Sequence, residues 1–133
     1  MGEGGKRRVL VVDDDARVRR MACVALRHHG FDVVDAGDGA SGLALARSAA
    51  PDLALVDIEL GDMNGLALVA ELRADPATAR LPVLVMSGAL VGGDERRGRD
   101  APRAPGCGPL EYLAKPFGAA DLVARIEGLL AAR

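Results

Sequence analysis

The chain has 133 residues with a formal net charge of −2, and 50% of its residues are hydrophobic but only 2% are aromatic. This length suits one domain with a single core, which must be built mainly from Val, Leu and Ala. The scarcity of aromatic rings argues against a flavin or nucleobase site, and the small negative charge gives no electrostatic reason to expect nucleic-acid binding.

The sequence carries no mark of secretion or membrane insertion. No apolar run approaches the ~20 residues that span a bilayer, and no signal-peptide pattern is present. The two cysteines, Cys23 and Cys107, lie in unrelated contexts and predict neither a disulfide framework nor a metal site. We therefore expect a cytoplasmic protein.

Strand and helix patterns alternate from residue 8 onward. Residues 1–7 are expected to form a flexible tail, and residues 8–12 a first strand. The next helix is predicted to begin after Asp15 as N-cap and to end at Gly30. Its spacing of apolar residues predicts an inward face made of Val18, Met21, Ala22 and Ala25.

The alternation continues to the end of the chain. Further strands are predicted over residues 31–35, 52–56, 83–86 and 110–114. Helices are predicted over residues 40–49, 66–73 and 119–131. The third helix should turn Leu68, Val69 and Leu72 inward, and the last helix Leu122, Val123, Ile126, Leu129 and Leu130.

One stretch departs from this pattern. Residues 92–108 should hold the fourth helix, but they are rich in Gly and Pro and offer no apolar stripe. We expect the fourth helix to be degenerate or disordered.

Short apolar strands separated by helices indicate an α/β domain with a parallel sheet. The expected architecture is flavodoxin-like: a doubly wound, five-stranded parallel sheet of strand order 2-1-3-4-5 with helices on both faces. We assign residues 8–133 to this one domain.

Four of the strands end on polar residues, which the fold should bring to one edge. The first strand leads into Asp13 and Asp14, and the others into Asp57, Ser87 and Lys115. Taken singly, each is more often a helix cap, a turn residue or a solvent-facing side chain. Together, crowded carboxylates raise one another's pKa unless a cation relieves them, and Mg²⁺ is the natural cation for such oxygen ligands.

These strand ends carry a family resemblance. Four segments resemble motifs of one family in the right order: VLVVDDDARVRR, LALVDIELGDMNG, VLVMSG and YLAKPF. The chain resembles the receiver domain of two-component response regulators, of the chemotaxis-regulator type, over essentially its whole length.

The resemblance implies roles for individual residues. Asp57 would accept a phosphoryl group from the phosphohistidine of a sensor kinase or of a histidine phosphotransfer protein. Asp14 would ligate Mg²⁺ directly, Asp13 mainly through water, and Asp57 and the backbone carbonyl of Glu59 would complete the protein's ligands. Lys115 and Ser87 would contact the phosphoryl oxygens. Ser87 and Tyr112 would act as switch residues, although a half-buried strand aromatic is nearly as good a reading of Tyr112.

Further expectations follow from the same resemblance. The protein would be a signalling phosphoacceptor and not an enzyme, with a downstream protein target and no direct nucleic-acid contact. A phosphorylation-dependent homodimer is a further expectation, as is a cis peptide bond before Pro116. A single-domain receiver is expected, with an excised part of a larger protein as the alternative.

The sequence also departs from the family, and other functions compete. Gly61 replaces a common proline, and Asn64 replaces a common acid. One competing hypothesis is an aspartate-nucleophile phosphatase of the haloacid-dehalogenase type, suggested by the acidic pair Asp57 and Glu59. The other is a receiver-fold interaction module that is never phosphorylated, although such a module would be expected to have lost an acid or the lysine.

Overall fold

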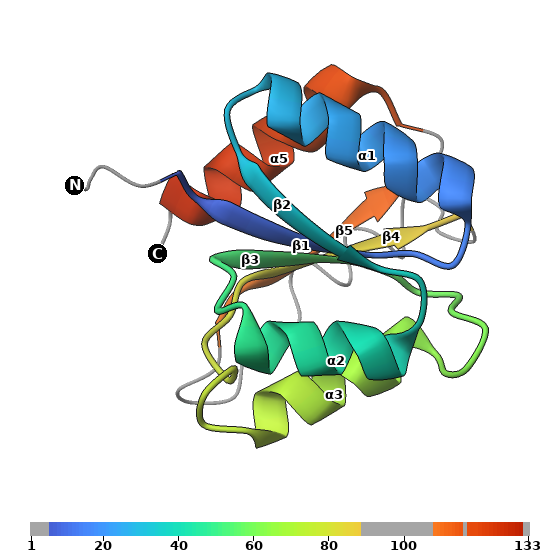
Figure 1. The fold of residues 1–133 in the computed structure, drawn as a ribbon, viewed down its shortest axis with the longest axis vertical. Helices are drawn as coiled ribbons and strands as arrows, with labels where there is room; N and C mark the ends of the chain where they lie inside the picture. The colour runs from blue at the N-terminus through green and yellow to red at the C-terminus, as the bar shows by residue number, and fades with distance from the viewer. Residues whose placement is uncertain (1–5, 89–107, 116, 132–133) are drawn as a thin grey trace.

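The computed structural model of the chain describes residues 6–88, 108–115 and 117–131. These residues form one parallel sheet with helices on both of its faces (Figure 1). The strands are β1 (Arg8–Val12), β2 (Asp32–Ala36), β3 (Leu53–Asp57), β4 (Val83–Ser87) and β5 (Leu110–Ala114). They lie in the order β2-β1-β3-β4-β5, which confirms the predicted sheet.

Two layers of helices enclose the sheet. The helices are α1 (Ala16–His28), α2 (Gly39–Ser48), α3 (Gly65–Ala74) and α5 (Ala119–Ala131). α1 and α5 cover one face and α2 and α3 the other (Figure 1). Every residue of β3 and β4 is buried, as expected for strands that are covered on both faces.

The predicted element boundaries are close to the observed ones. The first and fifth strands and the last helix have the predicted limits, whereas β2, β3 and α2 differ by one residue at each end. Asp15 caps α1 by accepting a hydrogen bond from the Arg17 amide, and Gly30 follows the helix with a φ of +96°. The inward faces predicted for α3 and α5 are confirmed.

The inward face predicted for α1 was partly wrong. The buried residues of this helix are Ala22, Cys23 and Leu26. Met21 is 37% exposed, and Val18 and Ala25 are only partly buried. The helix does carry one apolar stripe, but the side that packs on the sheet is rotated from the predicted one toward Cys23 and Leu26, which spacing alone does not reveal.

Arg73 of α3 ties the starts of β4 and β5 together. Its Nη1 donates hydrogen bonds to the carbonyls of Ala79 and Leu81, at 3.0 and 2.6 Å. Its Nη2 donates to the carbonyls of Gly108 and Pro109, at 3.2 and 3.1 Å. One guanidinium therefore satisfies four main-chain oxygens at the amino-terminal edge of the sheet.

Arg73→Met should lower the free energy of unfolding by about 2–3 kcal/mol, because it leaves partly buried carbonyls without their charged donor. Urea denaturation of the two proteins measures this loss. Arg80→Met is the matched control, since Arg80 is exposed and its replacement should change stability by less than about 0.5 kcal/mol. Equal losses in the two variants would contradict the role given to Arg73.

Several predictions concern residues that the structure does not describe. The expected tail includes residues 1–5, and Cys107 and the expected degenerate fourth helix, apart from its last residue Gly108, fall within residues 89–107. The cis peptide bond was expected before Pro116, and Pro116 is also not described. All of these lie outside the described residues. Among the described helices, none combines the length and the apolar character needed to cross a membrane.

Candidate functional site

The predicted polar residues meet at the carboxyl edge of the sheet. Asp57 is the last residue of β3 and Ser87 the last of β4, while Asp13 and Lys115 directly follow β1 and β5. Lys115 Nζ lies 3.3 Å from Asp57 Oδ1 and 3.5 Å from Asp13 Oδ2. The convergence expected from the parallel topology is therefore observed.

Three carboxylates form a compact acidic cluster at this edge. Asp13, Asp14 and Asp57 each offer an oxygen, and these oxygens lie within 4.8 Å of one another. Asp13 is fully buried and Asp57 is 4% exposed, whereas Asp14 faces solvent. The cluster is thus closed toward the sheet and open on the Asp14 side.

Burial makes the charged form of Asp13 less favourable. Its pKa is raised chiefly because burial disfavours the carboxylate and also because the Asp57 charge is near, although the Asp15 amide and Lys115 oppose this rise. Asp13 Oδ2 is buried and has no hydrogen-bond partner among the described residues. Its distance to Lys115 Nζ is that of an ion pair and is long for a hydrogen bond. This oxygen therefore keeps a hydrogen-bond acceptor position that no described residue uses.

The residues fit a divalent cation that prefers hard oxygen ligands. Two buried carboxylates and one exposed carboxylate are available, and one buried oxygen lacks a hydrogen bond. The solvent-facing side leaves room for the several waters that Mg²⁺ keeps in protein sites. Glu59, whose carbonyl was expected to join the ligands, lies in an isolated bridge with Asn64.

The loop after β3 is held close to Asp57. The Glu59 amide donates to Asp57 Oδ1 at 3.3 Å, and the Gly65 amide donates to the Ile58 carbonyl at 2.6 Å. A β-carbon on Gly65 would overlap the Asp57 carbonyl, so this position requires glycine. At Gly61 a β-carbon would lie 3.5 Å from Asp14 Oδ2, an ordinary contact. Gly61 stands where the family commonly has proline. The space around it would admit a β-carbon, so crowding does not explain the glycine.

Asp62 anchors this loop to α2 through a contact that no sequence pattern predicted. Its carboxylate accepts hydrogen bonds from the Gly39 amide at 2.8 Å and the Ala40 amide at 3.1 Å. These bonds, that of Gly39 first, hold the pKa of Asp62 below its ordinary value. Asp62 is thus a second acidic residue at the start of α2, besides the N-cap Asp38. No local pattern links residue 62 to the start of a helix that lies more than twenty positions before it in the sequence.

The two expected switch residues lie on neighbouring strands. Ser87 is 1% exposed, and its carbonyl accepts the Lys115 amide hydrogen bond at 2.9 Å. Tyr112 is partly buried and packs with the apolar cluster on the α2 and α3 side of the sheet. Ser87 is therefore hydrogen-bonded to Lys115, whose ammonium lies beside the acidic cluster. Tyr112 packs against the core instead.

Comparison with known proteins decides the family. The family model of the response regulator receiver domain matches residues 9–127. The chain belongs to the response regulator receiver family. The acidic cluster is thus the acid pocket at which this family accepts phosphoryl groups, and three carboxylates of this kind are typical of its Mg²⁺ site. A receiver domain is a signalling phosphoacceptor and not a conventional enzyme, and it implies a cognate histidine kinase.

Individual relatives agree with this membership. The chain is 36% identical over 125 residues to the DNA-binding response regulator MtrA of Mycobacterium tuberculosis, covering 94% of this chain and 51% of that protein. It is 42% identical over 123 residues to the transcriptional activator protein PfeR of Pseudomonas aeruginosa, covering 92% of this chain and 37% of that protein. The chain spans about half the length of the first curated relatives that it matches.

Solved structures give the same fold. The chemotaxis response regulator CheY4 of Vibrio cholerae superposes with a TM-score of 0.80 at 25% identity, covering 94% of this chain and 99% of that one. The receiver domain of the hybrid histidine kinase CckA gives a TM-score of 0.72 at 26% identity, covering 92% and 98%. The flavodoxin-like receiver fold predicted from the strand pattern is therefore confirmed.

Asp13→Asn should stabilise the metal-free receiver domain by about 1 kcal/mol, the usual size of a single-residue effect. The substitution removes a buried charge that Asp57 repels, and it should raise the melting temperature by about 4 °C. Because the pKa of Asp13 is raised in the folded state, the native protein binds this proton more tightly than the unfolded chain does. The penalty for the charge is therefore absent below the ordinary value of 3.8 and develops as the pH rises through the folded pKa.

Thermal denaturation of wild type and Asp13→Asn without divalent cations, from pH 7 downward, measures this difference. The advantage of Asp13→Asn should shrink as the pH approaches 3.8. Asp15→Asn serves as the control, because Asp15 is exposed and Asn is an equally good helix cap. A variant less stable than wild type at pH 7 would contradict the account of Asp13.

Proposed function

We propose that Asp57 of this receiver domain takes a phosphoryl group from a phosphohistidine, with Mg²⁺ bound at the acid pocket. The observation that carries this proposal is the placement of Lys115 Nζ 3.3 Å from Asp57 Oδ1, beside two further carboxylates. A haloacid-dehalogenase type of phosphatase loses its support, because the family match covers residues 9–127.

In the proposed reaction an Asp57 carboxylate oxygen forms a bond to phosphorus. The bond between phosphorus and the histidine nitrogen breaks, and its electron pair returns to the imidazole. Phosphoryl transfer needs mainly in-line positioning and neutralised oxygens. Lys115 supplies one positive charge at the carboxylate, and we assign to the Ser87 hydroxyl a hydrogen bond to a transferred oxygen.

We assign the Mg²⁺ ligands to the three acids of the pocket. Asp14, which is exposed, would bind the ion directly. Asp13 would act mainly through a bound water and Asp57 directly, with the Glu59 carbonyl as the remaining protein ligand. When bound, the ion supplies positive charge that neutralises the carboxylates and the incoming phosphoryl oxygens.

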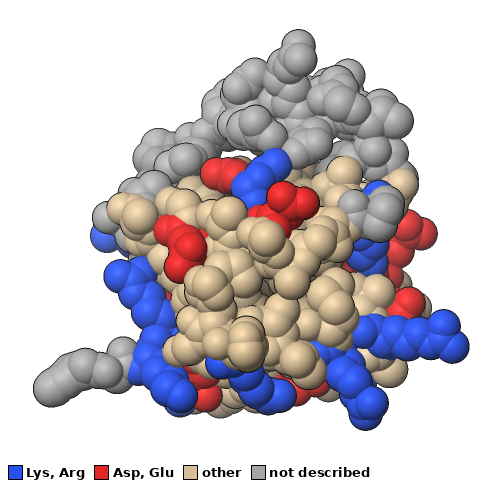
Figure 2. Space-filling model, turned by 90° about the horizontal axis from the view of Figure 1, so that it is seen from above, with Lys and Arg blue, Asp and Glu red and all other residues tan. Residues whose placement is uncertain are grey.

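The kinase would reach Asp57 across α1. Met21 and Val24 of this helix are 37% and 60% exposed. A hollow of about 300 Å³ lined by Val18, Met21, Lys115 and Phe117 adjoins the acid pocket. Uncharged surface occupies the middle of the α1 and α5 face, with both basic and acidic side chains around it (Figure 2). This surface suits the phosphohistidine-bearing helix of a kinase or of a histidine phosphotransfer protein.

The remaining steps of the proposal concern output. Phosphorylation would draw Ser87 toward the phosphoryl group and change the packing of Tyr112. A downstream protein, or a second copy of the chain, would recognise that change. A cytoplasmic location follows from this partnership, because the kinases that would supply the phosphoryl group use ATP.

Adding Mg²⁺ and beryllofluoride, a phosphoryl analogue, to the isotope-labelled chain tests the proposal by NMR. The amide signals of Asp57, Glu59, Ser87 and Lys115 should shift most, and Tyr112 should follow if it is a switch residue. Asp57→Asn is the control and should show no beryllofluoride-dependent shifts. Equal shifts in wild type and Asp57→Asn would contradict the assignment.

A further inference from the structure

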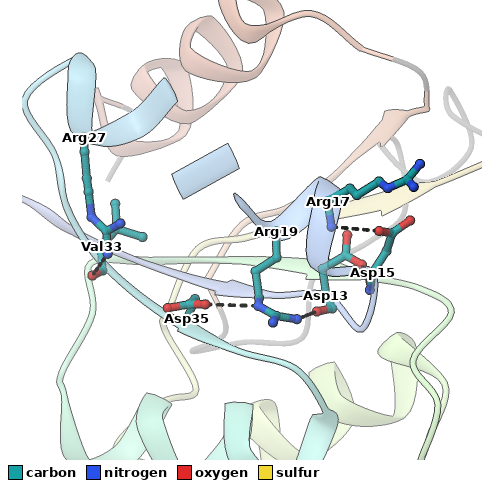
Figure 3. Close-up of polar contacts among 7 residues, drawn as sticks. All are labelled: Asp13, Asp15, Arg17, Arg19, Arg27, Val33 and Asp35. Carbon is teal, nitrogen blue, oxygen red and sulfur yellow. Dashed lines mark hydrogen bonds and ion pairs between the residues drawn. The ribbon is translucent and has the colours of Figure 1, made fainter. Parts of the chain in front are cut away.

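Arg19 joins three separate parts of the receiver domain. It projects from α1 and lies between the Asp13 main chain and Asp35 of β2 (Figure 3). Its Nη1 donates a hydrogen bond to the Asp13 carbonyl at 2.6 Å, and its Nε forms an ion pair with Asp35 Oδ2 at 3.0 Å. One side chain thus connects a helix and an edge strand to the loop that carries the acids.

Three hydrogen bonds hold Asp13, and they leave one of its carboxylate oxygens without a hydrogen bond from the described residues. Its amide donates to the Ala36 carbonyl at 3.1 Å, and its Oδ1 accepts from the Asp15 amide at 2.8 Å. Its carbonyl accepts from Arg19. The remaining oxygen, Oδ2, is buried and lacks a hydrogen-bond partner among the described residues. Of the three groups that hydrogen-bond to Asp13, only that of Arg19 belongs to a side chain, while Lys115 Nζ forms an ion pair with Oδ2 at 3.5 Å.

The guanidinium itself is fixed in orientation. Asp35 binds its Nε, and a β-carbon at Gly37 would lie 3.2 Å from its Nη1, so the backbone after β2 packs closely against it. The Arg19 side chain is 25% exposed. The neighbouring Arg17 and Arg20 are exposed and form no ion pair with a described residue. Arg19 therefore differs from the other arginines at the start of the same helix.

We propose that Arg19 is a positioning residue, which holds Asp13 so that Oδ2 faces the divalent cation and its waters. This inference rests on the proposed Mg²⁺ site. Groups that orient a metal ligand typically change the metal affinity about 10–100-fold when they are replaced. Without Arg19, the Asp13 peptide can rotate about its remaining contacts, and Oδ2 can leave the position that the cation requires.

Titration of the full chain with Mg²⁺, followed by NMR well below the melting temperature, tests the proposal. Arg19→Gln should weaken the affinity about tenfold. Arg19→Lys should lie between Arg19→Gln and wild type, because an ammonium can reach one of the two partners but not both. Arg20→Gln, on the same helix, should bind as wild type does. If Arg19→Gln does not fold, Asp35→Asn takes its place and should weaken binding measurably but by less than about tenfold, since it loosens the guanidinium without removing it.

Wild-type Mg²⁺ affinity in folded Arg19→Gln, or in Asp35→Asn when that variant replaces it, would overturn the proposal. A second measurement needs no metal: the carbonyl carbon signal of Asp13 in the metal-free protein should move in Arg19→Gln and stay in Arg20→Gln. An unmoved Asp13 signal would also overturn the proposal. A wild-type protein that binds no Mg²⁺, with the Asp13 signal moved as expected, would contradict the proposed metal site and not the contact between Arg19 and Asp13.

Discussion

Asp57→Asn should abolish the gain of one phosphoryl group that the wild-type chain shows with acetyl phosphate and Mg²⁺. Asn has nearly the same shape as Asp, but its neutral amide cannot attack phosphorus as a carboxylate can. The Lys115 ammonium, 3.3 Å from Asp57 Oδ1 in the wild type, would then face no anion at this position. Mass spectrometry of the intact proteins measures the result directly.

Two acids near the site provide matched controls for this experiment. Asp15→Asn replaces an exposed helix cap, and Asp62→Asn alters the loop that follows Asp57. Both variants should still gain one phosphoryl group, because neither carboxylate belongs to the acid pocket. A full-size mass increase in Asp57→Asn would show that another residue is the acceptor.

Asp14→Ala should lower the Mg²⁺ affinity more than any other single replacement outside Asp57. The proposed direct ligand loses a charged oxygen, whereas Asp13→Ala removes a ligand that is proposed to act through water. The loss should exceed the roughly tenfold change expected for an orienting residue. Titration with Mg²⁺ in the absence of phosphodonors measures these affinities.

Asp15→Ala is the control for the metal experiment. It removes the N-cap of α1 and should cost about 1 kcal/mol of stability. Its Mg²⁺ affinity should remain that of the wild type, because the Asp15 carboxylate is bound to the Arg17 amide. Equal affinities in wild type and Asp14→Ala would rule out Asp14 as a ligand.

The position of the site follows from the sequence because two simple patterns coincide. Uninterrupted apolar runs predict strands that are buried on both faces, and when helices alternate with such strands the sheet is parallel, with the carboxyl ends of its strands together. Asp13 follows such a strand, Asp57 ends one, and Lys115 follows the partly buried edge strand β5, so their meeting required no knowledge of side-chain packing. The proximity of Lys115 to both acids confirms this argument.

The contacts that support the site do not follow from the sequence. Arg19 pairs with Asp35 across elements, and Asp62 binds the amides of a helix that comes before it in the chain. Neither pair has a spacing that a local rule could identify. The α1 face was mispredicted for a related reason: Met21 and Leu26 are both apolar, and only the packed sheet shows that Leu26 is the buried one.

The most direct test of the central claim uses phosphoramidate, whose phosphorus–nitrogen bond resembles that of phosphohistidine. The wild-type chain is incubated with phosphoramidate and Mg²⁺, and the modified residue is then located by peptide mass spectrometry. The predicted result is one phosphoryl group per chain, on Asp57, which fails to appear when EDTA removes the Mg²⁺. A phosphoryl group on another residue, or continuous release of phosphate without a modified chain, would contradict the account.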